Sequence, residues 1–160
     1  EDQVNVVAPL ELLECCGPLE RESELTVLGE VRTFNNRTGV GSRLVISAFA
    51  RELRQEPGED ENRLELSGTL CKTPSLRATP LGRTICDMIL AVNRRYGRAD
   101  YLPCILWGRT AQEAAELPVG TQLALTGRLQ SREYIKMLGT TAERRTAYEI
   151  SAISAEPVRE

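Results

Sequence analysis

The sequence predicts an all-β protein built around a small five-stranded barrel with one short helix. Three observations support this fold class. Residues 62–154 hold five segments in which apolar and polar residues alternate, one helical segment falls between the third and the fourth, and turn residues separate the strands. Small barrels also need tight bends, which Gly68 and Gly127 allow because they carry no side chain.

Each element follows from its own pattern. The strand-like segments cover residues 62–72, 82–94, 100–108, 120–136 and 144–154. Residues 109–120 are rich in Ala and Glu and stop at Pro118 and Gly120, which predicts a short helix. Turn-forming residues fill 79–82 and 94–100. This order of elements is that of the OB-fold, and other small β-barrels are the alternative.

The N-terminal part repeats the end of this pattern. Residues 22–54 can be laid on 120–154, and residues 4–19 have the strand-then-helix pattern of 102–117. In this alignment Leu25, Val27, Gly29 and Val31 fall opposite Leu123, Leu125, Gly127 and Leu129. The repeat predicts that residues before the barrel form the second half of another OB unit, with chance similarity as the alternative. Phe34 and Phe49 are assigned to the core of that unit.

Three segments are therefore predicted: a partial OB-like unit at 1–55, an acidic linker at 56–61 and a complete OB domain at 62–156. The linker is indicated by Pro57 and Gly58 within a run of acidic residues. A partial barrel exposes open strand edges, which predicts a homo-oligomer, most simply a dimer.

Composition argues against several classes of protein. No apolar run approaches 18 residues, so no membrane span is predicted. The chain has no histidine and no P-loop, GxSxG or HExxH motif, so we expect no enzyme, no catalytic residue, no metal and no cofactor. The five cysteines form no CxxC pair, which favours reduced thiols in a cytoplasmic protein, with Cys71, Cys86 and Cys104 in the core.

The net charge of −3 hides an asymmetry along the chain. Residues 1–61 carry 13 acidic and 6 basic side chains, a formal charge of −7, whereas residues 62–156 carry 9 acidic and 13 basic ones, a formal charge of +4. A basic second part indicates a polyanionic partner for that part.

Strand parity separates two kinds of face. Tyr101 and Trp107 are six residues apart and share one face of their strand, whereas Leu102, Cys104 and Leu106 point to the other. The next strand repeats the arrangement, with an inward apolar row and an outward row of Arg128, Gln130, Arg132 and Tyr134. Arginines alongside outward aromatic rings are typical of single-stranded nucleic-acid binding, where cations attract phosphates and rings stack on bases. Tyr148 is interpreted as structural.

Five short motifs occur in order: NRLELSGTL (62–70), TPLGR (79–83), LAVNR (90–94), WGRTA (107–111) and GRLQSREY (127–134). Through them, residues 62–154 resemble the bacterial single-stranded DNA-binding proteins and their relative, primosomal replication protein N. The whole chain resembles a tandem-OB variant found in Firmicutes. The chain ends SAISAEPVRE rather than in the acidic tail of the replicative members, so the resemblance implies no recruiting role for this end.

The resemblance implies that four aromatic residues stack on bases: Tyr96, Tyr101, Trp107 and Tyr134. From the outward rows and the hairpin between the second and third strands, the residues expected to hold phosphates are Arg94, Arg95, Arg98, Arg128 and Arg132. Weaker candidates are Lys72, Arg77, Arg109 and Lys136.

The expected function is largely sequence-independent binding of single-stranded DNA in replication, repair or recombination, by a cytoplasmic, nucleoid-associated protein. The alternative is an OB-type protein-interaction module or a primosome accessory module in replication restart, which the acidic first part and the open edges favour. Replication or restart proteins are then further partners. RNA binding uses the same chemistry, and no residue here reads a 2′-hydroxyl.

Overall fold

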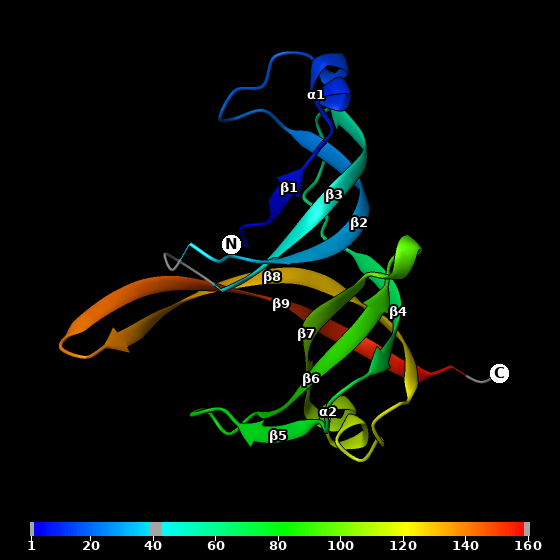
Figure 1. Ribbon diagram of the computed structural model, residues 1–160, viewed down its shortest axis with the longest axis vertical. Helices are drawn as coiled ribbons and strands as arrows, with labels where there is room; N and C mark the ends of the chain where they lie inside the picture. The colour runs from blue at the N-terminus through cyan, green and yellow to red at the C-terminus, as the bar shows by residue number, and fades with distance from the viewer. Residues whose placement is uncertain (1, 39–42, 159–160) are drawn as a thin grey trace.

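The computed structural model describes residues 2–38 and 43–158, and it arranges them as two units joined by a short connection (Figure 1). The first unit contains β1 (Asn5–Val7), α1 (Leu10–Cys16), β2 (Leu25–Asn35) and β3 (Leu44–Gln55). The second contains β4 (Leu64–Leu70), β5 (Ser75–Ala78), β6 (Thr84–Asn93), η1 (Arg95–Gly97), β7 (Ala99–Trp107), α2 (Gly108–Ala114), β8 (Gln122–Leu138) and β9 (Thr141–Pro157).

The second unit is a closed barrel. Its strands pair in the order β4-β8-β9-β7-β6, and β4 also pairs with β6, where Leu70 lies opposite Leu90. Among these pairs of barrel strands, only β9 and β7 run parallel, with Cys104 opposite Ile150. Helix α2 lies between the third and the fourth barrel strands. The predicted all-β OB-fold with a short helix is therefore confirmed.

The barrel core consists of the inward rows that parity predicts. Leu102, Cys104 and Leu106 on β7 are fully buried, and so are Leu123 and Leu125 on β8. The partly buried ring of Tyr148 packs against this core, as predicted. Cys71 was predicted to be a core thiol, and this was wrong: β4 ends at Leu70, so the next side chain is exposed.

Four elements differ from the prediction. Helix α2 ends at Ala114 rather than near Pro118, because its last turn gives way to tighter hydrogen bonds. The short strand β5 was not predicted, and it pairs with the edge of β6. Strands β8 and β9 each run for 17 residues and extend beyond the barrel as a long hairpin arm (Figure 1).

The first unit repeats the geometry of the barrel's second half. Its sheet has the order β1-β3-β2, with β1 parallel to β3 as β7 is to β9. A single shift along the chain carries Val6 onto Cys104, the bounds of α1 onto those of α2, and Gly29 onto Gly127. The register of β2 with β3 slips between Leu28 and Gly29, and that of β8 with β9 slips at the matching place, between Thr126 and Gly127.

The two glycines at these slips have a steric role. A Cβ built on Gly29 would overlap the backbone carbonyl of Phe49, and one built on Gly127 would overlap that of Ser151. No side chain fits where the two backbones approach so closely.

The units share a core and a buried ionic contact. Ile46 of β3 is buried within the barrel's apolar cluster. At the start of β7, Asp100 is buried and accepts hydrogen bonds from the Thr33 N–H (2.8 Å), the Thr33 hydroxyl (3.1 Å) and Arg94 Nε (2.8 Å). Arg94 Nη2 also donates to the Thr33 carbonyl (3.0 Å). The end of β2 is thereby fixed to the barrel.

The assignment of Phe34 and Phe49 to the core of the first unit was wrong. The ring of Phe34 is 53% exposed. The ring of Phe49 is only half-buried, and the guanidinium of Arg32 lies 3.9 Å from its centroid. Both residues belong to the outward face of β2 and β3, where Glu30 pairs with Phe49 and Phe34 with Val45.

Within the described residues, no helix is long and apolar enough to cross a membrane. The same residues contain no group of three or more His, Cys, Asp or Glu side chains that could hold a metal ion.

Candidate nucleic-acid interface

The outward face of β7 carries an aromatic residue near each end. Tyr101 is 55% exposed and lies opposite Ala91 of β6, whereas Trp107 is half-buried and lies opposite Ile85. Six residues at about 3.3 Å each separate the two by roughly 20 Å. The rings therefore cannot stack on one base, and they mark two ends of a path across the barrel.

Arg83 covers part of Trp107. Its guanidinium lies 5.0 Å from the centroid of the indole ring, close enough for a cation–π contact. Sequence reasoning did not select Arg83. Arg83 lies two residues before Ile85, which is paired with Trp107, and diagonal neighbours on paired strands reach each other.

The outward row of β8 is polar and interconnected. Arg132 Nε and Gln130 Nε2 both donate to Glu149 Oε1, at 3.2 and 2.8 Å, and this carboxylate on β9 is buried. Arg128 forms an ion pair of 3.2 Å with Asp2 of the first unit. The two guanidiniums stay about half exposed, so they can still attract a phosphate from solvent.

The cationic row and the aromatic row lie side by side with β9 between them. Ser151 of β9 pairs with Arg128 on one side and with Ile105 on the other. Since paired strands lie about 4.8 Å apart, the two rows are separated by roughly 10 Å. A nucleic-acid strand along this face could contact cationic side chains on β8 and aromatic side chains on β7 at once.

Arg94, which was predicted to hold a phosphate, is engaged in contacts within the protein. Its guanidinium is held by Asp100 and by the Thr33 carbonyl, and the hydrogen bond to Asp100 raises the pKa of Arg94. Burial raises the pKa of Asp100, but the hydrogen bonds from Arg94 and Thr33 outweigh it and hold this pKa below the ordinary 3.8. Arg94 is therefore a residue that joins the two units.

The other hairpin residues remain near the face. Arg95 and Arg98 are exposed, on and just after η1. Tyr96 lies in η1, and its side chain is outside the part of the structure that is described.

Tyr134 and Lys136 lie on the hairpin arm rather than on the barrel. Both are exposed and continue the row of Arg132 along β8. The alternate positions on the arm are apolar, and Ile135 and Met137 are about two-thirds exposed.

The other three weaker candidates lie outside the two rows. Lys72 follows β4 and is exposed. Arg77 of β5 forms a 2.6 Å ion pair with Asp87, and Arg109 of α2 forms one of 3.5 Å with Glu113. Two of the three thus already have an acidic partner.

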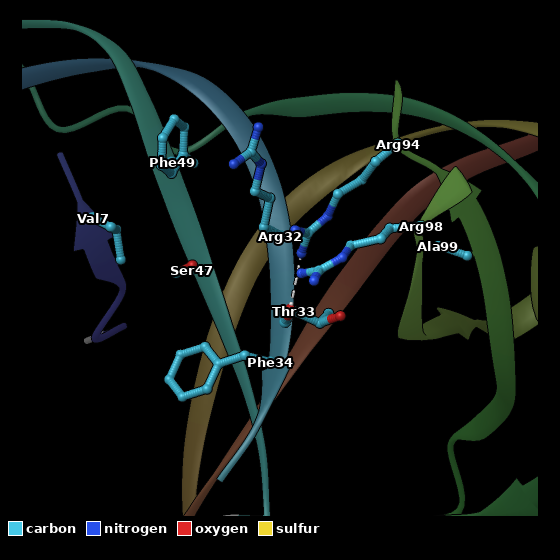
Figure 2. Close-up of a pocket in the computed structure, with 9 residues that line it drawn as sticks. All are labelled: Val7, Arg32, Thr33, Phe34, Ser47, Phe49, Arg94, Arg98 and Ala99. Atoms are coloured by element: carbon cyan, nitrogen blue, oxygen red, sulfur yellow. Dashed lines mark hydrogen bonds between the residues drawn. The ribbon is translucent and has the colours of Figure 1, made fainter. Parts of the chain in front are cut away.

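A groove with a volume of about 440 Å³ lies at the junction of the units (Figure 2). It is lined by Val7, Arg32, Thr33, Phe34, Ser47, Phe49, Arg94, Arg98 and Ala99. Sequence reasoning selected only the arginines at 94 and 98 from this set. The missed signal was parity in the first unit, which places Arg32 and Phe34 on one outward face of β2.

A family model and several curated proteins match part of this chain. The model of the single-strand binding protein family matches residues 61–158. Single-stranded DNA-binding protein 2 of Listeria innocua is 39% identical over 80 residues, which are 46% of this chain and 50% of the relative. Single-stranded DNA-binding protein A of Bacillus subtilis is 39% identical over 85 residues, 49% of each chain. The chain spans about half the length of these relatives.

Likeness to a solved structure extends into the first unit. The crystal structure of a deletion mutant of the single-stranded DNA binding protein from Thermus aquaticus superposes with a TM-score of 0.76 at 25% sequence identity, covering 93% of this chain and 67% of that one. The superposition covers more of this chain than the family model does, and the family model already matches more than half of it. The chain belongs to the single-strand binding protein family.

Proposed function

We propose that this chain binds single-stranded DNA along the outer face of its barrel, largely without regard to sequence. The observation that carries the proposal is the parallel arrangement of the two rows, with Tyr101 and Trp107 on β7 and Arg128 and Arg132 on β8. Every base has a π-face, so stacking at about 1–3 kcal/mol per base does not select a sequence. Phosphate contacts release counterions, so affinity falls as salt rises.

The predicted residues on the barrel face and on the arm then take different parts. The barrel face supplies Tyr101, Trp107, Arg128 and Arg132, and Arg98 extends the cationic surface at one end of β7. Tyr134 and Lys136 on the arm contact DNA that leaves the barrel. Tyr96 and Arg95 stay candidates on the hairpin. The chain acts by binding alone, in the cytoplasm at the nucleoid.

We infer that residues 1–55 are a partial OB unit, 56–61 a linker and 62–156 a complete OB domain. The matching register of β2–β3 and β8–β9 supports this division. In the barrel β4 pairs with β8 over Leu64–Thr69, whereas the matching stretch of β2, around Leu25–Gly29, has no such partner among the described residues. That open edge and the exposed apolar face of the arm favour a homo-oligomer, most simply a dimer.

Trp107 supplies the test, because it is the one tryptophan in the sequence. Its fluorescence is titrated with a dT oligonucleotide at low and at roughly physiological salt. Saturable quenching that weakens with salt supports stacking and phosphate contacts on this face. An unchanged signal at micromolar DNA, with no binding by anisotropy of labelled DNA, contradicts the proposal.

A double variant tests the cationic row. Arg128→Gln with Arg132→Gln should weaken DNA binding at least ten-fold and lower the salt slope by about two, since each phosphate contact contributes about one. The matched control is Arg21→Gln with Arg54→Gln, which removes two exposed arginines of the first unit, away from the barrel face. If the first variant binds as the control does, the face is misassigned.

The second candidate function is protein interaction, which the exposed Ile135 and Met137 favour. Replication or restart proteins are the partners that this reading implies, and similarity to primosomal replication protein N stays a prediction. Self-association that survives the Arg128 and Arg132 changes, without any DNA binding in the unmodified chain, would support this function instead.

A further inference from the structure

We propose that the groove between the two units is a second subsite for single-stranded DNA, in which Arg98 and Arg32 hold phosphates and Phe34 stacks on a base. The inference rests on the proposed function, because it concerns the same ligand after it leaves the barrel face. It adds a binding surface on the first unit, which sequence reasoning assigned to no ligand.

The charges in the groove fit a polyanion. Three of its nine lining residues are arginines, and no lining residue is acidic. Asp100 neutralises Arg94, and Glu30 accepts hydrogen bonds from both Arg32 and Arg51, each at 3.2 Å. One carboxylate therefore serves two guanidiniums, and the surface keeps an excess of positive charge. The other acidic residues of this unit are concentrated in α1, the segment before β2 and the linker.

Arg32 is held in place for such a contact. Its guanidinium lies 3.9 Å from the centroid of the Phe49 ring, and that of Arg51 lies 5.4 Å away. The Phe49 ring thus holds the Arg32 guanidinium in place, and the two guanidiniums cover the ring. The Nε of Arg32 is buried and has no hydrogen-bond acceptor among the described residues. That atom is closed to solvent, but 27% of the Arg32 side chain is exposed, and a guanidinium can offer further N–H donors to a phosphate oxygen.

Phe34 offers the stacking surface. About half of its side chain is exposed, and it stands at the position that matches Arg132 of the barrel. Figure 2 shows Phe34 on one side of β2 and the tips of Arg94 and Arg98 on the other. A strand of DNA that crosses β2 from the barrel would meet the cations first and the phenyl ring next.

The groove is continuous with the barrel face. Ala99 lines the groove, and Tyr101 is two residues further along the same face of β7. Two residues of a strand span about 7 Å. DNA stacked on Tyr101 therefore has only a short distance to cover before it reaches Arg98.

The experiment measures how the Phe34 side chain affects the binding of short and of long oligonucleotides. Affinity is measured for dT oligonucleotides of about 8 and about 24 nucleotides, since one OB-fold covers about 4–16. Phe34→Leu keeps an apolar side chain and removes the π-face. We expect it to weaken binding of the long oligonucleotide by about five-fold or more, given about 1–3 kcal/mol per stacked base, and to leave the short one unchanged.

Matched variants complete the design. Phe34→Tyr keeps an aromatic ring, so it should bind the long oligonucleotide as tightly as the unmodified chain does. Arg32→Gln should lower the salt slope for binding of the long oligonucleotide by about one. Leu10→Ala removes another exposed apolar side chain of the first unit and should change neither affinity.

Two outcomes overturn the inference while the proposed function stands. The first is equal affinity of the unmodified chain for both lengths, with quenching of Trp107 in each case. The second is a Phe34→Leu variant that binds the long oligonucleotide as tightly as Leu10→Ala does. Failure of the unmodified chain to bind either length would instead contradict the proposed function itself.

Discussion

The outward faces of the two units share one backbone and differ in chemistry. On the barrel, Arg128, Gln130 and Arg132 follow the slip in register, and on the first unit Glu30, Arg32 and Phe34 occupy the matching positions. Val31 and Leu129 are the matching apolar residues on the inward side, and a glycine lies at each slip. Inward residues and the glycine thus determine the strand geometry, whereas the outward positions are left to set what each face binds.

The units also differ in how much of their apolar surface they bury. The barrel closes on itself, and its core leucines are fully buried. The first unit places Ile46 in the barrel's core but leaves Leu10, Leu25 and Leu28 at least 40% exposed. Its stability therefore depends on contacts with the second unit, and the converse dependence is much weaker.

The largest expected effect comes from the two glycines. Gly127→Val forces a side chain into the carbonyl of Ser151 within the closed barrel, and we expect it to cost about 4 kcal/mol or more of unfolding free energy. Gly29→Val meets a similar overlap, but β2 has a free edge and can shift, so the barrel should stay folded. Urea unfolding and limited proteolysis measure both. An equal loss of barrel stability in the two variants would mean that the units fold as one.

Asp100→Asn tests the junction. Removing one charge of this largely buried pair should lower the free energy of unfolding by about 3 kcal/mol. This is the low end for buried pairs, because Arg94 is partly exposed. The pKa of Asp100 is lowered in the folded chain, so its contribution is present above pH 3.8 and is lost as the pH falls through the folded value.

Stability measured against pH checks the Asp100 prediction. The difference between the unmodified chain and Asp100→Asn should be full at neutral pH and shrink in acid. A constant difference across that range would rule out the ion pair as its source. Proteolysis should cut first within the first unit, because the loss of charge at Asp100 weakens the attachment of β2 at Thr33.

The smallest effect concerns single aromatic residues. Tyr101→Leu should weaken both short and long dT oligonucleotides by about five-fold, from about 1 kcal/mol of lost stacking, because its ring lies on the barrel face. Tyr148→Leu is the control: its ring packs against the core, so stability should fall while affinity for DNA holds. Fluorescence titration and thermal unfolding separate the two, and a loss of affinity only in the control would reverse the assignment of faces.

The sequence by itself determined the elements whose pattern is local. Alternation of residues along each strand predicted which side chains of β7 and β8 are buried, and the spacing of glycines predicted the bends. The repeat of these patterns predicted a partial OB unit before the barrel, and this division of the chain stays a prediction. These features depend on a period of two along one strand, so the neighbours of each residue in the chain are enough to read them.

Only the tertiary structure decided which charged and aromatic residues stay available. Arg94 was expected to bind phosphate, but Thr33 and Asp100, which lie far apart in the chain, hold it between the units. Phe34 was expected in a core, but the first unit's sheet leaves that face of β2 open. Both outcomes depend on how two units pack. A side chain's partner across such a contact is fixed by three-dimensional proximity, which no local pattern encodes.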